Sequence, residues 1–336
     1  MEKKTKDCLF GVCLTLKNGV IFMDKIFKEH IEVKDNFISL KSSSNCENQQ
    51  QTNEAFSEKW MEYENSNEKE KFYKMQQKWY LELYGFENED ALAKFLSTKK
   101  YIFDAGCGLG YKAKWFAELA PDSIVIGMDF SEACSIAANN YKHIKNLFFI
   151  KGDIADLPFQ DNSIDYVSCD QVIMHTEVPE ETFKELTRIT KNGGGEFVCY
   201  VYAKKALPRE LLDDYFRVET KNLTNEQLWE MSRQLTELGK RLSQLKIEID
   251  IPDIPLLGIK GGKQDIQRFI YWNFLKCYWN GEQGEDNSDM INFDWYSPSN
   301  ARRYSEDEFK KMISTNGLKI EFFHIEEACY SGRFSK

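Results

Sequence analysis

Between residues 101 and 202 the sequence alternates short apolar runs with segments that repeat apolar residues every three or four positions. The apolar runs have the length of buried strands, and the segments between them have the periodicity of amphipathic helices. Strands that alternate with helices predict an α/β fold, a parallel sheet with crossover helices on both faces. The predicted strands are 101–103, 123–128, 147–150, 164–169 and 196–202, and the predicted helices between them are 111–119, 132–141 and 180–191.

This alternation stops near residue 205 and resumes after residue 300. Ser305 and Glu308 form a capping-box pattern at the start of a helix predicted over 306–315, and a strand is predicted over 318–325. Residues 206–300 contain helical patterns at 223–245 and 264–279 and a turn-rich stretch between them. We therefore expect them to form a helical insertion between the fifth and sixth strands.

The residues before the alternation divide into three parts. Residues 1–40 have short alternating runs around turn signals and predict a small β appendage. Residues 41–54 are polar, with almost nothing to bury, and predict a flexible linker. Residues 55–98 have helical periodicity with a break at Gly85, and we expect these helices to cover the ligand site described next.

The first predicted strand ends in a glycine-rich turn, Phe-Asp-Ala-Gly-Cys-Gly-Leu-Gly at 103–110. Glycines at such a turn let the backbone bend sharply and let a ligand approach closely. A dinucleotide-binding fingerprint would place its third glycine at position 111, where tyrosine stands. Asp104 would repel a pyrophosphate but would attract a cationic amino-acid group. S-adenosylmethionine carries an ammonium and a sulfonium, so it is the cofactor that this turn predicts.

Further acids follow the next predicted strands. Asp129 ends the second strand, where it can accept hydrogen bonds from both ribose hydroxyls, and Asp153 follows the third, where it can accept the adenine amino proton. Ligands of open α/β sheets bind at the carboxyl ends of the strands. The predicted cofactor-binding residues are Asp104, Ala105, Gly106, Cys107, Gly108, Gly110, Asp129, Phe130, Gly152, Asp153, Ile154, Asp170 and Gln171.

With these motifs, residues 100–203 and 305–336 resemble the class I S-adenosylmethionine-dependent methyltransferases, near the ubiquinone/menaquinone-biosynthesis group. The resemblance implies a Rossmann-like, mostly parallel sheet of seven strands, whose last strand, here 329–335, runs antiparallel. It also implies that the turn glycines line the methionine moiety, that Asp129 holds the ribose, and that Asp153 and Ile154 frame the adenine.

The chain departs from the family after the fourth strand, where paired histidines are common. It has Asp170, Gln171 and His175 there, so the catalytic assignment stays open. His175 could be a general base, because histidine titrates near neutral pH, or it could cap or pack a helix.

The methyl acceptor is expected to bind to the helices before the core and to the insertion 206–300, whose aromatic residues could line a pocket or pack a lid. Basic residues recur in the insertion, and they could surround an anionic acceptor or belong to a solvated surface paired with acids. The candidate acceptor residues are Trp60, Arg268, Tyr271, Trp295, Tyr296 and Arg302.

Composition limits the classes of partner. The net charge of −10 argues against bulk nucleic-acid binding, and no apolar run reaches the roughly 18 residues of a membrane span. Nine scattered cysteines indicate reduced thiols in a cytoplasmic protein, and four histidines without a CxxC pair predict no metal site. We expect a methyltransferase for a small or medium-sized metabolite. The alternatives are an RNA- or protein-directed methyltransferase and a non-catalytic S-adenosylmethionine-binding scaffold. The pattern does not indicate an oligomeric state.

Overall fold

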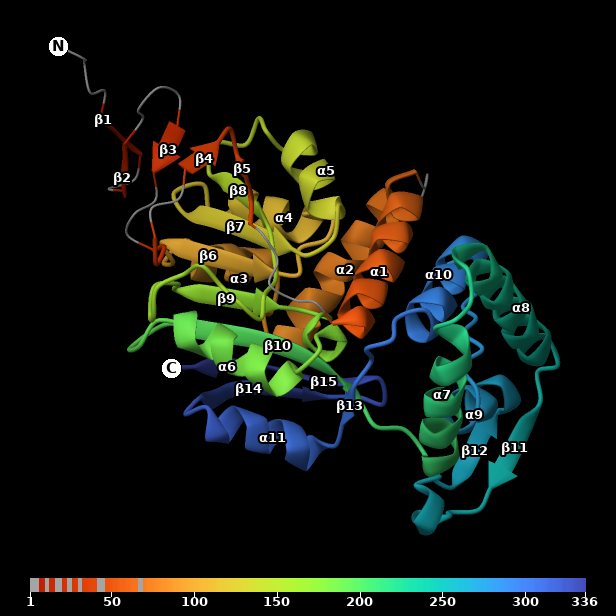
Figure 1. Ribbon diagram of the computed structural model, residues 1–336. Helices are drawn as coiled ribbons and strands as arrows, with labels where there is room; N and C mark the ends of the chain where they lie inside the picture. Colours follow the sequence, from red (N-terminus) through yellow and green to blue (C-terminus); the bar gives the residue numbers. More distant parts are fainter. Residues whose placement is uncertain are drawn as a thin grey trace. The chain divides into compact units, whose positions relative to one another are not determined.

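The computed structural model describes residues 6–9, 12–15, 20–22, 26–29, 32–40, 46–65 and 69–336 (Figure 1). The chain divides into two compact units, which we call the sheet unit and the helical unit. The sheet unit comprises residues 1–45, 60–202 and 304–336, and the helical unit comprises residues 46–59 and 203–303.

The sheet unit is built on one large sheet with the strand order β14-β15-β10-β9-β6-β7-β8-β5-β4-β3. The strands from β10 to β5 along this order are parallel, whereas β15 is antiparallel to both β10 and β14. The expected mostly parallel sheet with an antiparallel last strand is therefore confirmed. The bounds are β3 (Val20–Phe22), β4 (Glu32–Lys34), β5 (Phe37–Ser39), β6 (Tyr101–Ala105), β7 (Ile124–Asp129), β8 (Leu147–Lys151), β9 (Tyr166–Cys169), β10 (Glu196–Ala203), β14 (Lys319–Ile325) and β15 (Cys329–Ser335), with the two-residue β13 (Arg303–Tyr304) before the last helix.

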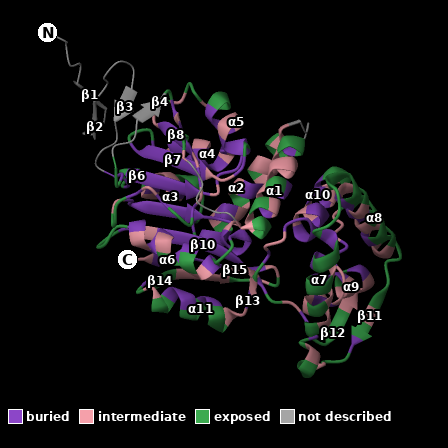
Figure 2. Ribbon diagram, viewed as in Figure 1, coloured by how far each residue is buried: buried purple, intermediate pink, exposed green. Residues whose placement is uncertain are grey.

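Helices cover both faces of this sheet (Figure 1). Neighbouring residues of β6 point to opposite faces, so Phe103 packs with α6 and α11 and Ile102 packs with α2 to α5. The central strands are buried between these two layers (Figure 2). The bounds are α2 (Lys69–Tyr84), α3 (Glu89–Leu96), α4 (Tyr111–Leu119), α5 (Ala133–Asn140), α6 (Pro179–Ile189) and α11 (Glu306–Thr315). Gly85, with φ of 70°, follows α2, and the Ser305–Glu308 capping box begins α11, both as predicted.

The N-terminal strands do not form the separate appendage that we expected from residues 1–40. Strand β5 pairs in parallel with β8, and β4 and β3 continue the main sheet beyond it. Ile38 is 7% exposed, and the ring of Phe27 stacks on Phe159 with centroids 5.1 Å apart, so this segment contributes to the core. Among the N-terminal strands that the structure describes, β1 (Lys6–Leu9) and β2 (Val12–Thr15) form a separate two-stranded sheet.

The predicted linker 41–54 is also wrong for its second part, because α1 (Glu47–Asn65) begins at Glu47. Residues 41–45 lie outside the described residues. The polar side chains of α1 bond to the backbone of residues 297–300: Gln51 donates to Ser297 O (2.8 Å) and accepts from Ser299 N (2.8 Å). Polar residues that find such partners can be buried, which composition alone does not reveal.

The helical unit contains four helices and a hairpin among its described residues 203–303. They are α7 (Leu207–Thr220), α8 (Asn225–Gln244), β11 (Glu248–Ile251), β12 (Gly262–Asp265), α9 (Ile266–Asn273) and α10 (Glu285–Tyr296). The helix predicted over 264–279 is thus shorter, and residues 292–296 form the end of α10. Their aromatic residues pack inside the unit; for example, the Phe293 ring stacks on Trp229 with centroids 4.0 Å apart.

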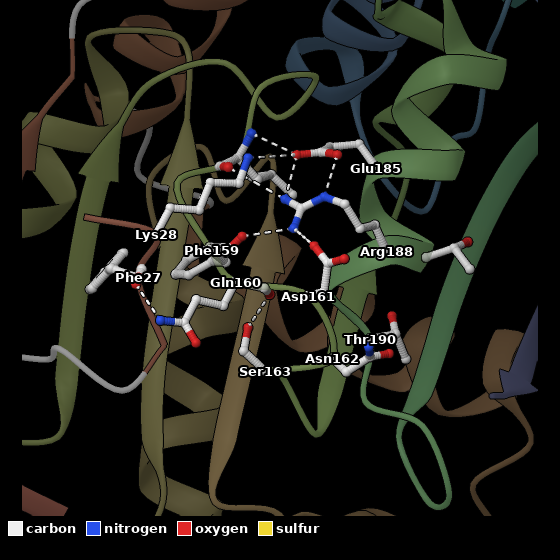
Figure 3. A network of polar contacts seen from close by, with 12 residues as sticks. Phe27, Lys28, Phe159, Gln160, Asp161, Asn162, Ser163, Glu185, Arg188 and Thr190 are labelled. Atoms are coloured by element: carbon white, nitrogen blue, oxygen red, sulfur yellow. Dashed lines mark hydrogen bonds and ion pairs between the residues drawn. The ribbon is translucent and has the colours of Figure 1, made fainter.

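One polar network fastens the loop before β9 to α6 (Figure 3). Arg188 donates to both carboxylate oxygens of Glu185 (2.7 Å each), to Asp161 (2.6 Å) and to Phe159 O (2.8 Å). Gln160 donates to Phe27 O (2.9 Å), and therefore the same loop also holds the N-terminal segment. The bonds from Glu185 raise the pKa of the Arg188 guanidinium, so the residue stays charged.

We predict that Arg188→Ala lowers the free energy of unfolding by about 2 kcal/mol. The substitution removes several charge-assisted hydrogen bonds, and the side chains of Arg188 and Glu185 that make them are largely buried. The measurement is the shift of the urea unfolding midpoint. Arg241→Ala is the matched control, since Arg241 makes one exposed pair with Glu237 and should shift the midpoint little. Equal shifts for the two variants would contradict the structural role of the network.

Candidate active site

The glycine turn after β6 has a backbone that other residues adopt with difficulty. Gly106 and Gly108 have φ of 74° and 52°, in the left-handed region. A Cβ added to Gly108 would lie 2.7 Å from the Trp60 ring, and one added to Gly106 would lie 2.4 Å from Val172. Gly106 N and Cys107 N donate to Met128 O at 2.7 and 2.9 Å, which ties the turn to β7. The turn therefore brings bare backbone to the carboxyl edge of the sheet.

Asp129, at the end of β7, fixes this turn from the neighbouring strand. One carboxylate oxygen accepts from Gly108 N (2.8 Å), and the other accepts from the backbone N (2.8 Å) and the hydroxyl (2.6 Å) of Ser131. Burial raises the pKa of Asp129, and these hydrogen bonds oppose the shift. Each carboxylate oxygen can accept more than one hydrogen bond, so Asp129 keeps capacity for a hydroxyl ligand.

Asp104 is a buried carboxylate without a hydrogen-bond donor among the described residues. It is 0% exposed, and neither oxygen has a hydrogen-bond partner. The nearest cation is Lys112, whose Nζ lies 3.8 Å from Oδ1. Burial raises the pKa of Asp104 to about 6, with Lys112 opposing the shift and Asp170 and Asp129 adding to it. Lys112 compensates this buried carboxylate only in part, because the same ammonium also pairs with Asp170 at 2.8 Å, so Asp104 suits a further, cationic ligand.

Lys112 links Asp104 to Asp170, and the sequence analysis did not identify it. Its Nζ donates to Asp170 (2.8 Å), which also accepts from the Tyr84 hydroxyl (2.7 Å). Gln171 lies beside them and donates to Gln76 (2.9 Å). A lysine directly after the glycine turn, on a helix face that is otherwise apolar, was the signal available in the sequence. Two acids and one lysine leave a net charge of −1, which complements the net +1 of S-adenosylmethionine.

The residues predicted for the ribose and adenine follow β7 and β8, which are adjacent. Asp129 pairs in register with Lys151, and Gly152 N donates to Asp129 O (3.0 Å). Asp153 accepts from Ala155 N (2.9 Å), and Ile154 is 6% exposed. The structure thus brings the predicted cofactor residues to one edge, although their contacts with a cofactor stay a prediction.

Aromatic side chains gather over the glycine turn within the sheet unit. Trp60, a predicted acceptor residue, reaches Gly108, as its distance from an added Cβ shows. The ring of Tyr73 stacks on Tyr111, the residue after Gly110, with centroids 4.3 Å apart. This places α2, and the end of α1 that carries Trp60, beside the turn, and that these helices cover a cofactor stays a prediction.

The candidate base His175 ends the short 3₁₀ helix Ile173–His175 and is 5% exposed. Its Nε2 lies 3.3 Å from the Tyr202 hydroxyl, and the two rings meet edge to face with centroids 5.4 Å apart. This contact is compatible with a packing role for His175 and also with a role in proton transfer. The catalytic role stays a prediction.

The other candidate acceptor residues belong to the helical unit. Tyr271, Trp295 and Tyr296 are buried, whereas Arg268 and Arg302 are exposed. Trp295 Nε1 and the Tyr296 hydroxyl both donate to one carboxylate, Asp213, at 2.9 Å. The structure therefore brings Trp295 and Tyr296 together at Asp213 and places the two arginines at the surface.

Within the described part of the chain, no cluster of three or more His, Cys, Asp or Glu side chains could hold a metal ion. The helices described there are too short or too polar to cross a membrane.

Comparison with known proteins places this edge of the sheet in a family. Residues 103–198 match the family model of the methyltransferase domain. An uncharacterized methyltransferase of Schizosaccharomyces pombe is 33% identical over 117 residues, which are 32% of this chain and 41% of that protein. The sterol 24-C-methyltransferase of the same yeast is 33% identical over 97 residues (28% and 25% of the two chains). The demethylmenaquinone methyltransferase of Staphylococcus carnosus is 32% identical over 122 residues (34% and 49%).

This chain spans less than half the length of each of these three relatives. The matched residues hold the glycine turn and the acids of β6, β7 and β8, the parts that carry the geometry described above. Residues 103–198 are therefore a methyltransferase domain of the class I, S-adenosylmethionine-dependent family, near the ubiquinone/menaquinone-biosynthesis group.

Proposed function

We propose that this protein transfers a methyl group from S-adenosylmethionine to a small or medium-sized metabolite. The observation that carries the proposal is the buried carboxylate of Asp104, which has no hydrogen-bond donor in the described structure and lies beside a backbone turn without side chains. Lys112 pairs with both Asp104 and Asp170 and compensates this carboxylate only in part, and the ammonium of the cofactor can supply the remaining positive charge.

The residues present fit the cofactor group by group. Asp104 and Asp170 would hold the ammonium, and Lys112 can pair with the carboxylate of the methionine moiety. Asp129 would hold the ribose hydroxyls, and Asp153 with Ile154 would frame the adenine. The cofactor supplies a methyl group on a sulfonium, which an acceptor atom displaces in line.

The protein contributes positioning and exclusion of water to such a reaction. Trp60 and the Tyr73–Tyr111 stack would exclude water above the glycine turn. We assign His175 as the candidate proton acceptor, oriented by the Tyr202 hydroxyl. An acceptor atom that carries no proton would not need it, and His175 would then only pack against Tyr202.

We assign acceptor recognition to the insertion, whose buried aromatic side chains and cations suit a metabolite better than a nucleic-acid backbone. The net charge of −10 supports this choice over an RNA substrate. The cysteines described in the structure are free thiols, which supports a reducing, cytoplasmic location. The sterol and demethylmenaquinone methyltransferases act on different acceptors, as their names state, so the acceptor atom is left to experiment.

Asp129→Ala should weaken the binding of S-adenosylmethionine at least about tenfold, because each hydrogen bond to a carboxylate contributes roughly 1.5–3 kcal/mol. The measurement is isothermal titration calorimetry on the folded variant. Asp122→Ala, which removes an exposed carboxylate next to β7, is the control and should bind as the wild type does. Unchanged affinity in Asp129→Ala would sink the ribose assignment.

Gly108→Ala should abolish cofactor binding, because the added Cβ lies where the ligand must approach and also meets Trp60. Gly193→Ala is a matched control: Gly193 has φ of 70°, but nothing lies within 4 Å of its added Cβ. Both variants bear backbone strain, and the contact with Trp60 adds to it in Gly108→Ala, so its circular dichroism melt should fall further than that of Gly193→Ala. Normal cofactor binding by Gly108→Ala would mean that the turn faces something other than the cofactor.

The affinity for S-adenosylmethionine should rise with pH between about 5 and 7, because the pKa of Asp104 is about 6 without ligand. Below that pKa the cofactor's ammonium must displace a proton, and above it the carboxylate is already ionised. Asp104→Asn should bind more weakly at pH 7 and show a smaller pH dependence. Calorimetry at several pH values with both proteins checks this, and identical pH profiles would contradict the role of Asp104.

A further inference from the structure

Three cations surround one buried indole ring in the helical unit. From the centroid of the Trp295 ring, Lys276 Nζ lies at 4.3 Å, Arg209 Cζ at 5.3 Å and Arg217 Cζ at 5.6 Å. Trp295 is 4% exposed. We call these four residues, together with Asp213, the Trp295 cluster.

Asp213 is the only carboxylate of the cluster, and the donors of its hydrogen bonds are residues other than Lys276. It is 0% exposed and accepts from Arg209 Nε (2.8 Å), Trp295 Nε1 (2.9 Å) and the Tyr296 hydroxyl (2.9 Å). It therefore compensates Arg209. Asp294, which precedes Trp295 on α10, forms an ion pair with Lys59 (2.8 Å). Asp213 is thus paired with Arg209, and the charge of Lys276 is left in excess within the cluster.

The ammonium of Lys276 has no carboxylate partner within the cluster. Its side chain is 8% exposed, and no carboxylate among the described residues lies within ion-pairing distance of its ammonium. Burial is the first cause that lowers its pKa to about 7, and Arg209 and Lys205 add to the shift while Asp294 and Asp213 oppose it. The contact with the Trp295 ring stabilises a cation only partly. A buried, uncompensated ammonium is costly in a structure that has no use for it.

We propose that the Trp295 cluster is an oxyanion-binding site, with Lys276 as its anchor, for a carboxylate or phosphate group of the methyl acceptor. The link to the acceptor rests on the proposed function, whereas the anion site itself rests on the cluster alone. Arg268 and Arg302, which the sequence predicts as acceptor residues, are both exposed. The cluster assigns anion recognition to Lys276 instead.

Anion binding should be linked to proton uptake. The groups that face Lys276 are Arg209, Asp213, Asp294, Lys205 and the Trp295 ring. An anion beside the ammonium raises the pKa of Lys276, so the neutral amine takes up a proton when the anion binds. The affinity for the anion should therefore be highest below pH 7 and should fall as the pH rises from about 7 to 9.

The test follows the indole N–H signals of the seven tryptophans by two-dimensional NMR, with Trp295→Phe identifying the Trp295 signal. The full chain is titrated with sodium benzoate and with inorganic phosphate at constant ionic strength. We expect a saturable shift of the Trp295 signal with at least one of them, and the better probe identifies the oxyanion as carboxylate or phosphate. Lys276→Met should weaken this binding at least about tenfold, and Lys276→Arg should retain it. Lys260→Met, which removes an exposed lysine of the same unit, should leave it unchanged.

The proposal is overturned if Lys276→Met binds benzoate and phosphate as the wild type does, or if neither anion shifts the Trp295 signal. If Lys276→Met does not fold, the wild-type affinity at pH 7 and 9 decides, and equal affinities overturn the proposal. Calorimetry with S-adenosylmethionine on the same samples separates the two proposals. Cofactor binding without anion binding refutes the site alone, and anion binding without cofactor binding refutes the methyltransferase proposal alone.

Discussion

The hydrogen bond from Gly108 N to the Asp129 carboxylate joins two neighbouring parallel strands at the point where both end. It fixes the turn after β6 against β7, and the bonds from Gly106 N and Cys107 N to Met128 O complete the connection. Because hydrogen bonds to the neighbouring strand β7 hold the turn in place, its glycines can present bare backbone to a ligand. Asp104 lies under the same turn, and its lack of a donor follows from the fact that the turn's N–H groups are directed to β7.

The sequence predicts this part of the fold well because its signals are local. The alternation of apolar runs with helical periodicity from 101 to 202 matches strands β6 to β10 and helices α4 to α6 closely. Glycines at 106, 108 and 110 have the positive φ that such a turn needs, and the Ser305–Glu308 pattern begins a helix as a capping box does. Each of these features depends on neighbours a few positions away, so a single sequence contains the necessary information.

The errors concern contacts between residues far apart in the chain. Residues 47–54 look like a solvated linker until the backbone of 297–300 provides hydrogen-bond partners for Gln51 and its neighbours. The pairing of β5 with β8 joins Phe37 to Phe149, and nothing local to either strand specifies that partner. Lys112 and Lys276 were missed for the same reason. A lysine is usually exposed, and only the folded chain shows which acids or aromatic rings surround it.

The pairing of β5 with β8 also bears on self-association. Strand β8 reads Leu-Phe-Phe-Ile-Lys, a short apolar segment of high β-propensity, and its outer row of backbone donors and acceptors would face solvent if β5 were removed. Exposed edges of this kind are templates on which a second chain can add a strand. By pairing with that edge, residues 37–39 occupy the backbone groups of β8 to which a second chain could otherwise add a strand. Strand β5 thus protects the edge of β8, although it lies outside the methyltransferase domain match at 103–198.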